Sequence, residues 1–121
     1  MDSLSISFNI DRESEVKSLK ILINQCWKTL PIYEGKGKDG SIVYSKEVAY
    51  DNFQKHLDFL IMKLSGASKV WFKNQHYIEL LYMLLGMKTV TEDEHAKVKY
   101  IVNHCTNLIN SMIEEVNTYA S

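Results

Sequence analysis

The sequence predicts an all-α domain, a four-helix bundle-like fold with a small β-hairpin or a short N-terminal strand as decoration. Apolar residues recur at steps of three and four along four separate segments, which is the period of an amphipathic helix. Capping residues and glycines separate these segments. The chain has 121 residues, of which 45% are hydrophobic and 24% charged. This composition fits a single helical domain over residues 1–121.

The first helix is expected over residues 11–30, with Asp11 or Ser14 as its cap. Its apolar face consists of Val16, Leu19, Ile23, Cys26 and Leu30. Pro31 is expected to end it, because the residue before a proline is pushed out of helical geometry. The ten residues before this helix alternate between apolar and polar types, which is typical of a strand. The apolar members are Leu4, Ile6, Phe8 and Ile10.

Residues 31–45 are expected to form a loop or a small hairpin. The Asp39-Gly40 pair favours the positive torsions of a tight hairpin turn. Ser45 then opens a second helix over residues 46–65, and Ser65-Gly66 is expected to stop it. Its apolar stripe consists of Tyr50, Phe53, Leu57, Leu60 and Leu64.

The third helix is expected over residues 75–86 and the fourth over residues 91–119. The third is expected to face the core with Ile78, Leu81, Tyr82 and Leu85. Leu80, Met83 and Leu84 widen its apolar surface to most of the circumference, so we expect it to lie centrally or against a partner. Thr91 and Glu94 have the spacing of a capping box for the fourth helix. The fourth stripe consists of Val98, Ile101, Val102, Cys105, Leu108, Ile109, Met112 and Val116.

Composition and charge exclude several classes of protein. The net charge of −1 gives no global field that would attract nucleic acid or an anionic membrane. The N-terminus lacks a basic segment followed by a long apolar run, and no apolar run approaches the roughly 20 residues of a membrane span. Cys26 and Cys105 occupy apolar positions, so we expect buried free thiols and a cytoplasmic location. Abundant Lys, Asn, Ile and Tyr suggest a bacterium or a mobile element.

Four residues are the candidates for a metal site: His56, His104, Glu92 and His95. Glu92 and His95 have the Glu-x-x-His spacing that di-iron bundles place on two of their helices. Here the Glu-x-x-His motif occurs only once, whereas a di-iron site needs two copies. It also lies at the start of a helix, where Glu92 is expected to act as a capping residue. We therefore predict no metal and no other cofactor, and interpret the histidines as boundary residues with hydrogen-bond partners.

No motif predicts catalysis. His104 precedes Cys105, but adjacent helical residues point about 100° apart, so their adjacency is no sign of a nucleophile and its base. The loop from Gly35 to Gly40 lacks the phosphate-binding spacing with a following helix. The lysines and aromatics between residues 69 and 77 could contact a nucleic acid. The acidic balance makes this the weaker hypothesis.

The sequence therefore favours a non-enzymatic protein–protein interaction module, a small inhibitor, immunity protein or regulator. The alternatives are a helical sensor that binds a metal or an apolar ligand in the bundle core, and a nucleic-acid-binding regulator. An enclosed cavity with His56 and His104 converging on it would favour the sensor. The predicted partner-binding residues are Lys69, Trp71, Phe72, Lys73 and Tyr77, and, in the loop, Tyr33, Lys36, Lys38 and Tyr44.

Two expectations follow for the aromatic segment and for the third helix. Trp71→Ala should weaken binding to the partner and leave the thermal stability nearly intact. The third helix could also join two copies of the chain as a homodimer, because its apolar surface is wider than one core face requires.

Overall fold

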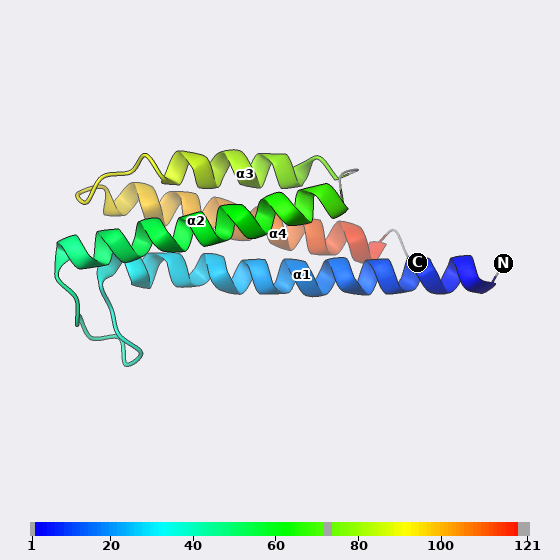
Figure 1. Cartoon of the computed structure of the whole chain (residues 1–121), viewed down its shortest axis with the longest axis horizontal. Coiled ribbons are helices and arrows are strands. Elements are labelled where there is room, and N and C mark those ends of the chain that lie inside the picture. The colour runs from blue at the N-terminus through cyan, green and yellow to red at the C-terminus, as the bar shows by residue number, and fades with distance from the viewer. Residues whose placement is uncertain (1, 72–73, 119–121) are drawn as a thin grey trace.

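Four helices make up the regular structure of the part of the chain that the computed structural model describes, residues 2–71 and 74–118, with side chains from residue 12 onward. They are α1 (Asp2–Glu34), α2 (Lys46–Val70), α3 (His76–Met87) and α4 (His95–Thr118) (Figure 1). Their packing into one bundle confirms the all-α prediction. Within the described residues, none of the helices combines the length and the apolar composition that a membrane crossing requires.

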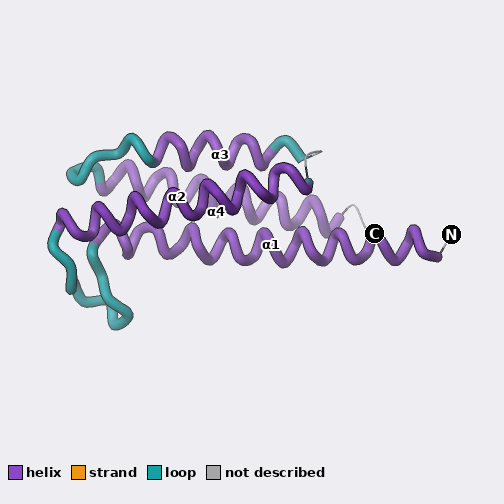
Figure 2. Tube along the Cα trace, viewed as in Figure 1, coloured by secondary structure: helices purple, strands orange, loops and turns teal. Residues whose placement is uncertain are grey.

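The helices form a ring in which each one lies beside two others. α1 packs against α2 and α4, and α3 packs against the same two helices. α1 and α3 therefore stand opposite each other across the core, as do α2 and α4. Figure 2 shows the chain running back and forth along the long axis, so neighbouring helices are antiparallel.

Apolar side chains from all four helices fill the middle of the ring. Its fully buried members include Leu19, Phe53, Leu57, Leu60, Tyr77, Leu80, Ile109 and Met112. Each large apolar side chain buried in this way stabilises the fold by about 1.5–3 kcal/mol. The stripes predicted on the second and fourth helices supply many of these residues.

Helix α1 begins at Asp2, well before the predicted range of 11–30. The N-terminal strand predicted from Leu4, Ile6, Phe8 and Ile10 is therefore wrong, because the backbone of these residues is helical. A strand without a neighbouring strand leaves its backbone N–H and C=O groups unpaired, whereas a helix pairs them internally. The described residues contain no strand that could pair with this segment.

Pro31 lies inside α1, so the prediction that it ends the helix is also wrong. The helix stops at Gly35, whose φ of 77° is left-handed. The Gly35 N–H donates to the Ile32 carbonyl at 3.1 Å, and the Lys36 N–H donates to the Pro31 carbonyl at 3.0 Å. This pair of bonds is the Schellman motif of a helix C-terminus. A Cβ at Gly35 would stand 3.0 Å from the Tyr44 carbonyl oxygen, so the position requires glycine.

The connection between α1 and α2 is a turn and not the predicted hairpin. Its one β contact among the described residues is an isolated antiparallel bridge between Lys36 and Ile42. The predicted turn is present, with the Gly37 N–H donating to the Ser41 carbonyl at 2.8 Å and Gly40 at a φ of 84°. Its arms do not extend into strands because nothing covers them. Ile42, for example, is 74% exposed.

Helix α2 starts as predicted and runs further than predicted. The Ser45 hydroxyl caps its start by accepting the Val48 N–H at 3.3 Å. The predicted stop at Gly66 is wrong, since the helix continues to Val70. Gly66 lies on open surface, with no atom within 4 Å of where a Cβ would stand. The buried Ala67 attaches the additional turn to the core.

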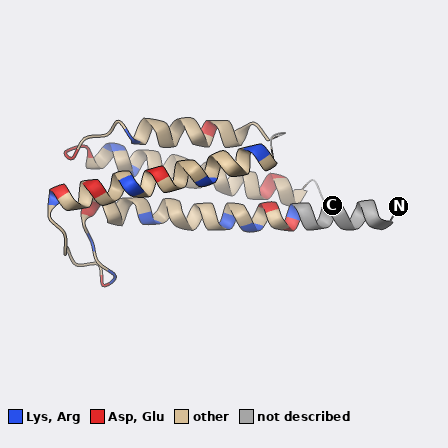
Figure 3. Ribbon diagram, in the orientation of Figure 1, with Lys and Arg blue, Asp and Glu red and all other residues tan. Residues whose placement is uncertain are grey.

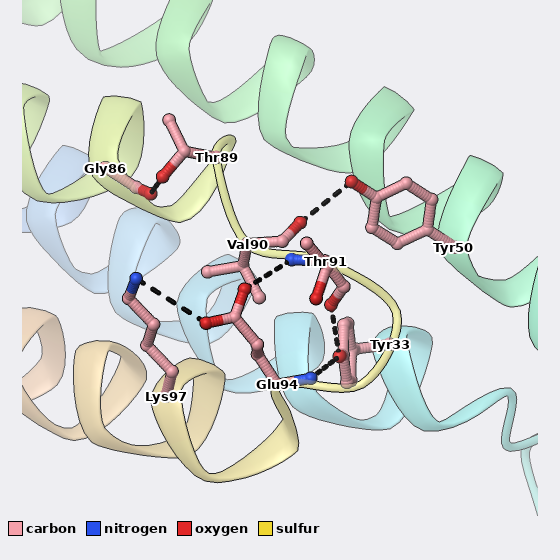
Figure 4. A network of polar contacts seen from close by, with 8 residues as sticks. All are labelled: Tyr33, Tyr50, Gly86, Thr89, Val90, Thr91, Glu94 and Lys97. Atoms are coloured by element: carbon pink, nitrogen blue, oxygen red, sulfur yellow. Dashed lines mark hydrogen bonds and ion pairs between the residues drawn. The ribbon is translucent and has the colours of Figure 1, made fainter.

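Helix α3 begins and ends within a residue of its prediction, whereas α4 begins at His95 and not at residue 91. Thr91 and Glu94 form the turn before α4, in which the Glu94 carboxylate accepts the Thr91 N–H at 2.9 Å. Tyr33 of α1 completes this turn (Figure 4). Its hydroxyl donates to the Thr91 carbonyl at 2.6 Å and accepts the Glu94 N–H at 3.0 Å.

Candidate interaction surface

Helix α3 carries apolar side chains on both its inner and its outer face. The buried inner residues are Tyr77, Leu80, Leu84 and Met87. The outer residues Ile78, Tyr82 and Leu85 are 51%, 71% and 44% exposed. Steps of four and three residues place these outer residues in one row along the helix, called the α3 stripe from here on. The prediction that Ile78, Tyr82 and Leu85 face inward is therefore wrong, because the core takes the other apolar side of the helix.

The α3 stripe has almost no charge beside it on its own helix. Glu79 is the only Asp, Glu, Lys or Arg within α3. Figure 3 shows the rest of the α3 ribbon free of acidic and basic residues, in contrast to α2. A surface helix ordinarily turns charged residues to the solvent. An apolar row there is characteristic of a binding surface.

A row on the outside of α2 continues this surface. Its members are Asp58, Met62, Gly66 and Lys69, spaced at steps of four, four and three residues. Met62 is 66% exposed. Asp58 forms an ion pair with Lys88, directly after α3, so the row borders α3. The α3 stripe and this row together are called the α2–α3 face.

Polar contacts fix α3 at both ends. At its start, the Asn74 side chain accepts the His76 N–H at 3.1 Å, and the His76 ring lies 3.4 Å from the Glu115 carboxylate of α4. At its end, the Gln54 amide donates to the Lys88 carbonyl at 3.1 Å. The stripe is therefore held in one position, which reduces the conformational entropy that a partner would have to remove on binding.

Two buried polar groups lie beneath α3, near each other across the core. Glu15 of α1 is 9% exposed and Tyr77 is 0% exposed. Neither Glu15 Oε2 nor the Tyr77 hydroxyl has a hydrogen-bond partner among the described residues. Burial raises the pKa of Glu15, and burial together with the nearby Glu15 raises the pKa of Tyr77. Tyr77, predicted as a partner-binding residue, thus belongs to the core.

The predicted aromatic site between residues 69 and 77 does not form one exposed surface. Trp71 is half-buried and stacks on Tyr77, with ring centroids 6.2 Å apart. It therefore covers one end of the core, and this contact favours a loss of stability in Trp71→Ala over the expectation that stability stays nearly intact. Lys69 is exposed. Phe72 and Lys73 lie outside the described residues.

The predicted loop site is likewise divided. Tyr33 is only 9% exposed, and its hydroxyl is occupied at the start of α4, so it is a core residue and not a surface contact. Lys36, Lys38 and Tyr44 are exposed. The Lys36 ammonium lies 3.2 Å from the Glu34 carboxylate.

His56 and His104, the first two metal candidates, do not converge. His56 Nε2 lies 2.9 Å from the Gln25 carbonyl and 3.1 Å from the Thr29 hydroxyl, in the contact between α1 and α2. Burial lowers the pKa of His56. His104 stands on the outside of α4, with its ring 4.6 Å from that of Tyr100. The two histidines occupy helices that are not neighbours in the ring, and His104 is exposed to solvent.

The other two metal candidates, His95 and Glu92, lie at the start of α4. His95 Nε2 is 2.7 Å from a Glu34 carboxylate oxygen, and Glu92 is exposed. In the described part of the chain, no group of three or more His, Cys, Asp or Glu side chains could hold a metal ion.

Both cysteines are buried and free, as predicted. Burial raises the pKa of Cys26 and of Cys105 to about 12. The Cys105 thiol contacts the Met83 sulfur at 3.7 Å. A thiol with so high a pKa is almost entirely protonated near neutral pH, so neither cysteine is an activated nucleophile.

Two depressions on the described surface are open to solvent and lie along α1 and α4. One is lined by Ser111, Glu114, Glu115 and Thr118, and another by Arg12, Glu13, Val16, Lys17, Lys20 and Asn117. Neither lies within the bundle core, and neither includes a histidine or a cysteine.

Comparison with known families, with curated proteins and with solved structures finds no match to this chain. The function must therefore be argued from the molecule itself.

Proposed function

We propose that this protein is a non-enzymatic interaction module that binds another polypeptide through its α2–α3 face. The observation that supports this most is the α3 stripe. It is a row of exposed apolar residues on a helix that already packs a different apolar face into the core. Tyr82 is 71% exposed, so burying it would remove about 150 Å² from water, of which about 100 Å² is apolar, and contribute roughly 2–3 kcal/mol. An exposed tyrosine with apolar neighbours is also the typical composition of an interface hot spot.

This proposal fits the placement of the other groups better than the two alternatives. A sensor would require ligand-binding groups that meet inside the bundle, whereas His56 lies in the contact between α1 and α2 and His104 is exposed on the outside of α4. A nucleic-acid regulator would require several lysines or arginines on the binding face, whereas α3 carries none and the α2 row contributes only Lys69, with Asp58 at its other end. An inhibitor, an immunity protein or a regulator requires only a shaped surface, which the α2–α3 face supplies.

Affinity capture with matched surface variants tests the proposal. The tagged chain, Tyr82→Glu and Tyr100→Glu would each be expressed in the native cells, and the retained proteins compared quantitatively. Tyr100 is a suitable control because it is an equally exposed tyrosine, at 65%, on α4. We expect a bound protein that the wild type and Tyr100→Glu retain and Tyr82→Glu loses. Equal retention by all three forms would contradict the proposal.

A further inference from the structure

We infer that the α2–α3 face binds a second copy of this chain, in an antiparallel pairing about a two-fold axis that passes by Tyr82. This inference rests on the proposed function, because it names the polypeptide that the face binds. It follows from three properties of the face: the order of its apolar residues, the positions of its charges and the area it exposes.

The α3 stripe is nearly symmetric about its middle residue. Ile78 precedes Tyr82 by about one helical turn, and Leu85 follows it by about one turn. If two stripes pack antiparallel with the tyrosines together, Ile78 of one copy meets Leu85 of the other, and each apolar residue covers an apolar residue. A two-fold interface must be self-complementary in this way.

The single charge of α3 favours the antiparallel direction over the parallel one. In a parallel pairing the two Glu79 carboxylates would lie at the same level, and like charges facing each other oppose binding. In the antiparallel pairing Glu79 instead lies at the level of Leu85 of the second copy. The rise per residue then separates the two Glu79 residues by about 9 Å along the helix axis.

The α2 row has the same symmetry and matching charges. Asp58 and Lys69 stand at its two ends, with Met62 and Gly66 between them. Antiparallel pairing about the middle of this row brings Asp58 of one copy to Lys69 of the other, twice. It also places the exposed Met62 against Gly66, where the surface is open because no side chain occupies it. The row is therefore complementary to itself in both charge and shape.

The two symmetric rows share one centre, which a single two-fold axis requires. The ion pair between Asp58 and Lys88 fixes how α2 and α3 are aligned. The middle of the α2 row is residue 64, which follows Asp58 by six residues. Tyr82 precedes Lys88 by the same six residues along the antiparallel α3. The middle of the α2 row and Tyr82 thus lie at about the same level along the bundle. One axis can therefore relate both rows to their copies.

The exposed area matches a small, reversible dimer. A specific interface buries at least about 1,000 Å² in total, or about 500 Å² from each copy. Ile78, Tyr82, Leu85 and Met62, with the aliphatic part of Lys69, offer on the order of 500 Å² per copy. We therefore expect a dimer that dissociates on dilution in the micromolar range, and not a permanent one.

Cysteine cross-linking tests this pairing directly. Residues at a two-fold axis between packed helices meet their own copies, within the Cα separation that a disulfide needs. We treat the Tyr82→Cys protein, at tens of micromolar, with the oxidant diamide. We expect a disulfide-linked species of twice the 14.0 kDa chain mass. Tyr100→Cys is the control and should give little of it. The native cysteines are buried and should remain unreactive. Equal yields from the two variants, or no yield from Tyr82→Cys, would overturn the inference.

Charge reversal tests the direction of pairing with a different measurement. In sedimentation equilibrium, Lys69→Glu should weaken dimerisation by about fivefold, because it brings two acidic residues together. Asp58→Lys alone also breaks the ion pair with Lys88, so it is measured as a reference. The double variant should dimerise more tightly than either single variant, because each pair between copies is then opposite in charge again. A double variant that dimerises as weakly as Lys69→Glu alone would overturn the antiparallel pairing.

The failure of this inference can be told apart from the failure of the proposed function. If Tyr82→Cys does not cross-link to itself while affinity capture retains a different protein in a Tyr82-dependent manner, the second copy is not the occupant and the proposed function stands. If neither self-association nor Tyr82-dependent capture occurs, both are wrong.

Discussion

The buried carboxylate of Glu15 should make the stability of this bundle depend on pH in a way that one substitution removes. Burial raises the pKa of Glu15 above its ordinary value of 4.5. An acid whose pKa is raised by folding stabilises the folded state fully below its unfolded-state pKa, and this stabilisation is lost as the pH rises through the raised value. As the pH rises from about 4 to neutral, the ionisation of Glu15 should therefore lower the free energy of unfolding.

Glu15→Gln should remove this decrease in the free energy of unfolding, because glutamine does not ionise. Burial raises the pKa of Glu15 by more than its contact with the Tyr77 hydroxyl lowers it, and neither Glu15 Oε2 nor that hydroxyl has a hydrogen bond of good geometry. A buried polar group in this situation costs about 1–3 kcal/mol. A neutral glutamine needs no desolvation of a charge, and its amide can donate to the Tyr77 oxygen. We expect the free energy of unfolding to increase by about 1–2 kcal/mol at pH 7.5, with little change at pH 4.

Urea denaturation followed by circular dichroism, at both pH values, measures this effect. Burial raises the pKa of Glu34, but His95 and Lys36 together lower it by more, so the pKa of Glu34 lies below its ordinary value. A hydrogen bond from the Thr91 backbone lowers the pKa of Glu94. The stabilisation that Glu34 and Glu94 give the fold is lost as the pH falls, in wild type and variant alike. The difference in the free energy of unfolding between wild type and Glu15→Gln therefore isolates the effect of Glu15. Glu13→Gln, the same change at an exposed neighbour, should alter stability little at either pH. A Glu15→Gln difference that is the same at pH 4 and pH 7.5 would refute the reasoning.

Further predictions concern the anchoring of α4, the end of the core and the thiols. Tyr33→Phe removes two hydrogen bonds at the α4 turn and should cost about 2 kcal/mol in urea denaturation, whereas Tyr44→Phe, at an exposed site in the nearby loop, should cost almost nothing. Trp71→Ala should cost about 2 kcal/mol, because the side chain is half-buried on the core, and an unchanged melting temperature would show that it packs on nothing. Cys26 and Cys105, each with a pKa raised to about 12, should react with a thiol reagent at pH 8 at least about a hundredfold more slowly in the folded protein than in urea. Equal rates would contradict their burial.

The sequence was sufficient to predict four helices and the core faces of α2 and α4. Side chains at steps of three and four locate the buried face of a helix, as Phe53 and Leu57 on α2 show. Ser45 marked the start of α2, because a cap acts locally through its own hydroxyl. Such signals depend on neighbours in the chain and can be read without knowing the fold.

The ends of the helices depended on tertiary context that the sequence does not display. Gly66 reads as a helix stop, yet α2 continues past it because the buried Ala67 holds the next turn on the core. Pro31 reads as a helix end, yet Gly35 provides the actual C-terminal motif one turn later. In both cases the cost of an unfavourable residue is smaller than the gain from packing beyond it.

The candidate surface was only partly predictable. The apolar girth of α3 indicated more than one apolar face, but periodicity alone does not say which residues face the core. The structure buries Tyr77 and exposes Tyr82, and half-buries Trp71, which had been expected in a partner site. The α2 row gave no signal at all, because Met62 and Gly66 form a surface only where α3 lies beside them.

Photo-cross-linking in intact native cells tests most directly whether the α2–α3 face is a binding surface. A photoreactive phenylalanine analogue would replace Tyr82 in one form of the chain and Tyr100, the control, in another. Because both side chains are exposed to a similar extent, random collisions should label both positions equally. We predict a discrete cross-linked polypeptide, a second copy or another protein, from position 82 that is several times stronger than any from position 100. Equal, diffuse labelling from both positions would contradict the proposed function.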